Sequence, residues 1–76
     1  MPYIKQEDRS RAQHSPETAG ELNYALTMLC KEFLGKMPNY QRFNDAIGAL
    51  EGCKLEQYRR MVAPYEDIKI QYNGDV

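Results

Sequence analysis

Hydrophobic positions recur at helical spacing in two stretches of the chain, and together they predict an all-α protein. In the first stretch, the apolar side chains follow one another at intervals of four, three and four residues, which places them on one face of a helix. They are Leu22, Leu26, Leu29 and Phe33. The pattern predicts a first helix over residues 19–34.

Both ends of this stretch carry residues that start or stop helices. Thr18 and Glu21 have the spacing of a capping box, in which each side chain accepts a hydrogen bond from the other residue's backbone amide. Gly35 suits the position that follows a helix, and Pro38 prevents continuation. We therefore expect a short turn between the two helical stretches.

The second stretch begins at Asn39, a predicted N-cap, and carries more apolar surface than a helix as short as the first can cover. It predicts a second helix over residues 40–72, kinked at Pro64, because a proline ring clashes with the preceding turn. The alternative is that Pro64 ends one helix and begins another. The expected fold is an antiparallel helical hairpin whose second helix extends several turns beyond the first. An unpartnered apolar face predicts self-association, so we expect an oligomeric helical bundle. The predicted interface side chains are Phe43, Ile47, Leu50, Met61, Val62 and Ile68.

Residues 1–16 form a polar leader with alternating charges and without a helical apolar stripe. We expect this leader to be extended, with the apolar tip at Met1–Ile4 docked on the helices and a looser stretch from Arg9 to Pro16. A short helical turn over Gln6–Arg11 is the alternative.

Composition limits the class of protein. The chain has 76 residues, of which 42% are hydrophobic and 28% charged, which predicts one small folded domain over residues 1–76. The net charge of -1 gives no general attraction to nucleic acid or to anionic lipid. No long apolar run predicts a membrane span or a signal peptide, so a cytoplasmic location is expected. Cys30 and Cys53 are then expected to be reduced thiols that pack as small hydrophobic residues.

The residue types needed for catalysis are missing or dispersed. His14 is the only histidine and lies in the leader, far in sequence from either cysteine. The glycines do not form a phosphate-binding loop, and the cysteines lack metal-ligand spacing. We therefore expect no enzymatic activity, no catalytic residues, no cofactor and no metal site.

Cations and phenols alternate along the second predicted helix, near Pro64. Guanidinium and ammonium groups bind phosphate, and tyrosine rings stack on planar ligands. The predicted ligand-binding side chains are Lys54, Tyr58, Arg59, Arg60, Tyr65 and Lys69. The structural alternative is aromatic packing with solvated cations and, for Lys54, an ion pair with Glu51. A Glu56–Arg60 pair on the solvent side is also expected from its spacing.

Five segments of the chain carry a resemblance to a known group of proteins. They are Met1–Ile4, Glu21–Ala25, Asn44–Glu51, Tyr58–Lys69 and Asn73–Val76. The pattern is similar to a family of small uncharacterised proteins encoded by bacteriophages and prophages. Its most specific part is the Pro-Tyr-Glu-Asp-x-Lys block, and the resemblance covers nearly the whole chain. It implies a phage or bacterial cytoplasmic origin, in the host cytoplasm for a phage protein, but no established activity.

Two functions from different classes fit these features. The first is a non-enzymatic binding protein that forms homo-oligomers through its helices or docks on a host protein. The alternative is an oligomeric sponge that sequesters a small anionic nucleotide used as an immune signal, which would be an anti-defence activity. Nucleic-acid binding is a third hypothesis, and the near-neutral charge and the absence of a known motif argue against it.

Overall fold

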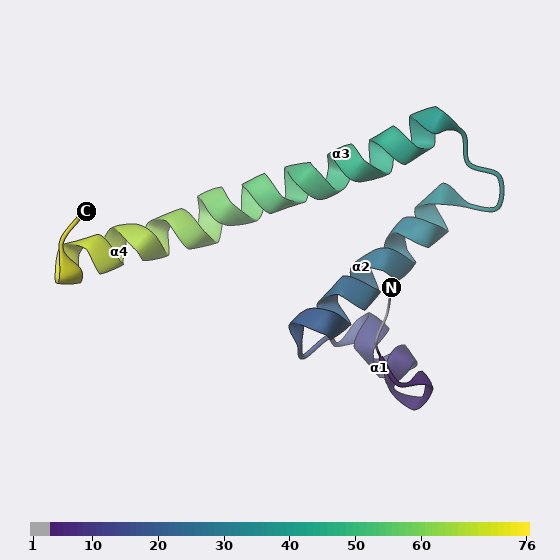
Figure 1. Cartoon of the computed structure of the whole chain (residues 1–76), viewed down its shortest axis with the longest axis horizontal. Coiled ribbons are helices and arrows are strands. Elements are labelled where there is room, and N and C mark those ends of the chain that lie inside the picture. Colours follow the sequence, from purple (N-terminus) through teal and green to yellow (C-terminus); the bar gives the residue numbers. More distant parts are fainter. Residues whose placement is uncertain (1–3) are drawn as a thin grey trace. The chain divides into compact units, whose positions relative to one another are not determined.

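The computed structural model of the chain describes residues 4–76, and every regular element in this range is helical (Figure 1). This confirms the predicted all-α class. The elements are the 3₁₀ turn η1 (Gln6–Asp8), α1 (Arg9–His14), α2 (Ala19–Leu34), α3 (Tyr40–Gln57), the π-helical segment η2 (Tyr58–Val62) and α4 (Ala63–Asn73). By its internal contacts the chain divides into two compact units, Met1–Phe43 and Asn44–Val76. The antiparallel pairing of the two long helices stays a prediction.

In the first unit, α2 covers the range that the sequence predicts. The Thr18 hydroxyl accepts a hydrogen bond from the Glu21 backbone amide at 3.1 Å, which is one half of the predicted capping box. The Glu21 carboxylate also accepts a hydrogen bond from the amide of Glu17 at 2.9 Å. At the other end, Gly35 has a φ of 74°, a left-handed conformation that glycine adopts without strain.

The leader is not extended as predicted, because residues Gln6–His14 form η1 and α1, and the alternative of a helical turn over Gln6–Arg11 is confirmed. The prediction of an extended leader was wrong because it looked for a helical apolar stripe, whereas α1 needs only one small side chain at its contact with α2. Ala12 is fully buried, and α1 packs against α2. At the tip, Met1–Tyr3 lie outside the described residues; Ile4 is half-buried, and a Cβ on Gly20 would lie 3.9 Å from its Cδ1 atom.

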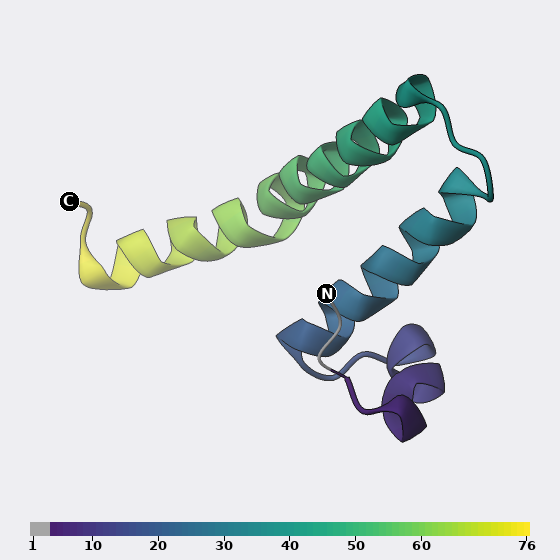
Figure 2. The same cartoon turned by 45° about the vertical axis from the view of Figure 1, so that its right-hand side comes forward.

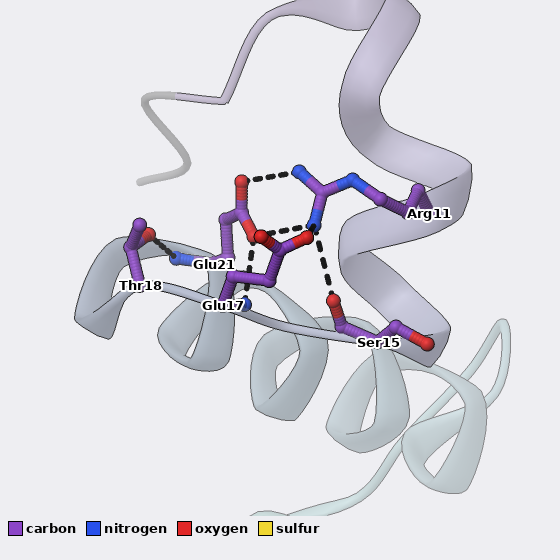
Figure 3. Close-up of polar contacts among 5 residues, drawn as sticks. All are labelled: Arg11, Ser15, Glu17, Thr18 and Glu21. Atoms are coloured by element: carbon purple, nitrogen blue, oxygen red, sulfur yellow. Dashed lines mark hydrogen bonds and ion pairs between the residues drawn. The ribbon is translucent and has the colours of Figure 1, made fainter.

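A polar cluster holds α1 against the start of α2 (Figure 3). Arg11 donates two parallel hydrogen bonds to the Glu21 carboxylate, at 2.8 and 2.5 Å. The same guanidinium donates to the Ser15 carbonyl and to the Glu17 carboxylate, each at 3.1 Å. Paired hydrogen bonds between a guanidinium and a carboxylate are strong and fix both groups in orientation. We call Arg11, Ser15, Glu17 and Glu21 the leader clamp.

The start of α3 is fixed to the end of α2 within the first unit. The Asn39 side chain accepts a hydrogen bond from the Arg42 amide at 2.9 Å, as expected of an N-cap. Arg42 also donates to the Phe33 carbonyl, and its guanidinium carbon lies 4.1 Å from the centre of the Phe33 ring. These contacts terminate α2 and begin α3 with few residues between them.

In the second unit, α3, η2 and α4 form one uninterrupted helical run (Figures 1 and 2). Pro64 lies in the first turn of α4 and does not end the run. The irregularity comes just before it, where the Ala63 amide bonds to the Tyr58 carbonyl five residues earlier. A proline ring clashes with the carbonyl four residues before it, here that of Arg60, and a widened turn gives this carbonyl room.

Burial is sparse in the described part of the chain. Only Ala12, Tyr24 and Ala46 are buried among residues 4–76. A helix in a globular protein normally gains most of its stability from packing of an apolar face. The contacts in the structure therefore leave most of the apolar surface of α3 and α4 without cover.

Candidate functional site

The feature that stands out in the second unit is the exposed apolar face of α3 and α4. Ile47 is 67% exposed, Met61 67% and Ile68 52%, whereas a core side chain would be almost fully covered. Leu50 is the least exposed of the large side chains, at 36%. Of the predicted interface residues, Val62 alone is half-buried. Exposed apolar surface of this extent is typical of sites that bind another protein.

The sixth predicted interface residue, Phe43, belongs to the first turn of α3, and it is 47% exposed. Its amide donates to the Asn39 carbonyl at 3.1 Å, so its position follows from the helix N-cap. Phe43 thus lies on the same helix as Ile47 and Leu50, at a spacing that places the three on one face.

Lys54 interrupts the apolar face of α3. Its ammonium group pairs with the Glu51 carboxylate at 3.3 Å, which is the local pairing given above as the structural alternative to ligand binding. Both side chains are largely exposed, so the pair contributes little to stability. Lys54 therefore places an exposed ammonium group within the apolar face of α3.

Two arginines share one carboxylate in the next turn. Glu56 accepts from Arg60 at 2.8 Å, as the sequence predicts, and also from Arg59 at 2.6 Å. The hydrogen bond from Arg60, followed by that from Arg59, lowers the pKa of the Glu56 carboxyl. Because two cations share one anion, one positive charge of this cluster is not neutralised within it.

The aromatic residues of the predicted ligand set have partners close to them in the helix. The Tyr58 hydroxyl donates to the Glu66 carboxylate at 2.5 Å, across the π-helical segment, and this hydrogen bond raises the pKa of the phenol. The Lys69 ammonium lies 5.6 Å from the centre of the Tyr65 ring, within range of a cation–π contact. Both contacts join residues of one helical run.

One of the predicted ligand residues, Arg60, lines a hollow on the surface of the second unit. This shallow, open hollow is lined by Cys53, Glu56, Gln57, Arg60 and Met61. Ligand pockets normally bury most of their ligand. This hollow, on a single helix, provides one wall of a site at most.

Sequence reasoning missed the leader clamp and misplaced one cysteine. Arg11 and Glu21 are ten residues apart and belong to different helices, so no helical spacing relates them. The only feature of the sequence that points to the leader clamp is a glutamate three residues after Thr18, and helix capping is sufficient to explain that glutamate. Cys30 is half-buried, but Cys53 is exposed and is not the buried hydrophobe that we expected, because its side of α3 has no cover within the unit.

Two further properties bear on the choice of function. Among residues 4–76, no three histidine, cysteine or carboxylate side chains lie close enough together to hold a metal ion. In the same range, no helix combines the length and the apolar character that crossing a membrane requires.

The fold and site together define a small all-α protein whose long terminal helix presents an exposed apolar face. The chain belongs to the family described as Domain of unknown function (DUF6899), whose model matches residues 1–76. Its resemblance to a family of uncharacterised proteins is thereby confirmed. Comparison with the curated proteins gave no match, and neither did comparison with the solved structures.

Proposed function

We propose that this protein is a non-enzymatic binding protein that acts through helix-mediated association, with the apolar face of α3 and α4 as its docking surface. The observation that carries the proposal is the exposure of this face along the whole second unit. The resemblance described above supports a bacteriophage or bacterial cytoplasmic setting, in which the docked partner is a second copy or a host protein.

The energetics favour a partner. Fully burying one leucine, isoleucine or methionine side chain contributes about 1.5–3 kcal/mol. Covering the exposed side chains of α3 and α4 would therefore supply on the order of 5–10 kcal/mol, comparable to the whole stability of a small domain. A chain of 76 residues gains much from such an association, because a domain of this size has a small core.

A charge placed on the face tests the proposal. Leu50→Glu puts a carboxylate among the apolar side chains, and we expect it to abolish the assembly that the parent protein forms in sedimentation-velocity experiments. Gly52→Glu is the matched control, because it adds the same charge about 200° around the helix, where a new Cβ meets no atom within 4 Å. This control should leave the sedimentation coefficient unchanged.

The result that contradicts self-association is a folded monomer for all three proteins, with helix content checked by circular dichroism. In that case the face would have to bind another protein. Capture of one stoichiometric host protein by the parent, and its loss in Leu50→Glu, would support this form of the proposal.

Sequestration of an anionic nucleotide is the second candidate function. The observation that favours it is the positive charge left over where Arg59 and Arg60 share Glu56. A phosphate could displace the carboxylate from either guanidinium, since both side chains are largely exposed.

Calorimetric titration with a cyclic dinucleotide tests this candidate. The parent should bind, and the double variant Arg59→Ala with Arg60→Ala should lose binding while keeping its helix content. The double variant Lys31→Ala with Lys36→Ala removes the same charge elsewhere and should bind normally. Equal binding by the two double variants would show that the arginines are not the site, and no binding by the parent would contradict the candidate.

A further inference from the structure

The spacing of residues along α3 indicates what kind of partner the apolar face fits. Successive positions on that face alternate between four and three residues apart, which is the spacing of the contact positions in a coiled coil. In the second unit they are Ile47, Leu50, Lys54 and Gln57. The face is therefore suited to a single long partner helix.

The π-helical segment decides which residues continue this line into α4. A turn closed by a hydrogen bond over five residues holds one residue more than a regular turn. Each residue after η2 therefore lies at the angle around the helix axis that the residue before it would have in a regular α-helix. Without η2, Pro64 and Ile68 would continue the line. With it, Tyr65 and Lys69 do, and Ile68 lies about 100° away.

We give the name seam to the resulting line of contact positions. The seam consists of Ile47, Leu50, Lys54, Gln57, Val62, Tyr65 and Lys69. Val62, at the end of the wide turn, is half-buried, and Ile47 and Tyr65 are exposed at 67% and 59%. The seam has a polar centre made of Lys54 and Gln57, with Ile47 and Leu50 on one side of it and Val62 and Tyr65 on the other, and it ends at Lys69.

We propose that a second copy of this chain occupies the seam and runs antiparallel to the first, with Lys54 of each copy opposite Gln57 of the other. This inference rests on the proposed function and adds the identity, direction and register of the partner. Its basis is the polar centre, because a lysine at a contact position within a coiled coil specifies the register in which two helices pair.

The direction follows from the charge of Lys54. In a parallel pair in register, the two Lys54 ammonium groups would face each other across an apolar seam, where like charges repel strongly. In an antiparallel pair centred between residues 55 and 56, each ammonium faces the Gln57 amide, whose oxygen accepts a hydrogen bond. Lys54 can keep its 3.3 Å pairing with Glu51 at the same time, because Glu51 lies beside the seam and not within it.

The register follows from matching polar with polar. In this alignment Leu50 faces Val62 and Ile47 faces Tyr65, so apolar side chains cover one another. A shift by seven residues in either direction would place Lys54 opposite Leu50 or Tyr65. Gln57 would then face an aliphatic side chain and lose its hydrogen-bond partner, which is costly for a buried amide.

Disulfide trapping tests the arrangement. In chains carrying Cys30→Ser and Cys53→Ser, the variants Ile47→Cys and Tyr65→Cys are oxidised separately and as an equimolar mixture. Both positions are exposed in the chain, so each variant should keep its helix content. We expect a mixed disulfide between the two variants in the mixture, and no symmetric disulfide from either alone, because identical positions would lie about 25 Å apart.

Each other outcome has a distinct meaning. A symmetric disulfide from each variant alone would show a parallel pair and overturn the proposal. No disulfide from a protein that still sediments as an assembly would overturn the seam but leave helix-mediated association intact. A parent that sediments as a monomer would remove both the inference and self-association.

A second variant tests the role of the polar centre. In chains that also carry Lys54→Met and Gln57→Leu, the centre of the seam is apolar and no longer favours one direction over the other. We expect symmetric disulfides to appear beside the mixed one in this background. Retention of the mixed disulfide alone would show that Lys54 and Gln57 do not set the direction.

Discussion

The two units of this chain differ in how far their helices bury side chains against one another. In the unit that ends at Phe43, a leader helix of six residues buries Ala12 against α2, and the leader clamp fixes it there. In the unit that begins at Asn44, a helical run several times longer buries Ala46 alone. The comparison shows that the length of a helix does not determine how many of its apolar side chains are buried. The short α1 packs against α2 through one small residue and one arginine, whereas the long helical run has no packed partner helix within its unit.

The largest effect should come from enlarging the buried side chain of the first unit. Ala12→Leu adds three carbons where Ala12 has no exposed surface, and overpacking of this kind costs about 1–3 kcal/mol. We expect α1 to detach from α2, which amide hydrogen exchange would show as lost protection of residues 9–14. Ala49→Leu makes the same change at an exposed position of α3 and should leave α1 protected.

The outcome that contradicts the comparison is equal protection of α1 in both variants. It would mean that the leader clamp alone holds α1, and that the contact at Ala12 can adjust to a larger side chain. In that case the difference between the two units would be one of polar contacts rather than of packing.

The next prediction concerns the pH dependence of the leader clamp. The hydrogen bond from Arg11 and the one from the Glu17 amide lower the pKa of the Glu21 carboxyl to about 2 from 4.5. Between these pH values the unfolded chain binds more protons than the folded one, so the stability from the clamp is complete above pH 4.5 and is lost as the pH falls toward 2. We expect α1 to lose its docking over this range.

Carbon NMR of the Glu21 carboxyl would measure this pKa directly. In Arg11→Gln the value should return toward 4.5, since the main cause of the shift is removed. Arg9→Gln is the control, because Arg9 bonds to the Ile4 carbonyl and leaves the clamp intact. A Glu21 carboxyl that titrates at its ordinary pKa in the parent would show that the clamp does not form.

A structural feature of this chain could be predicted from the sequence where the residues that cause it lie within a few positions of one another. The helix over residues 19–34 was predictable because its cap at Thr18, its apolar spacing and its stop at Gly35 lie within a few residues. The helical leader was not, because Ala12 and Arg11 reveal their role only once α2 is beside them.

The same distinction holds for the candidate site. The pairs of Lys54 with Glu51 and of Arg60 with Glu56 follow from spacing on a helix, and both were expected, the first as the alternative to ligand binding. The position of the π-helical segment did not follow, because a proline acts on the turn before it and more than one change of the helix relieves its clash. The choice among them determines whether Ile68 or Lys69 lies on the seam.

The smallest effect should come from replacing the glycines of α3. These glycines lie on the side of the helix away from the seam, so the replacement tests whether that side takes part in association. A Cβ added at Gly48 or Gly52 meets no atom within 4 Å, and alanine stabilises a helix interior by about 1 kcal/mol relative to glycine. Gly52→Ala should therefore raise the melting temperature of the helix while leaving the sedimentation coefficient unchanged, because Gly52 lies about 200° around the helix from Leu50.

Two glycines four residues apart also suit a close approach of a second helix, and in that case the added methyl groups would weaken the assembly. Loss of association in Gly52→Ala, with Leu50→Glu still associating, would move the docking surface from the seam to the glycine face.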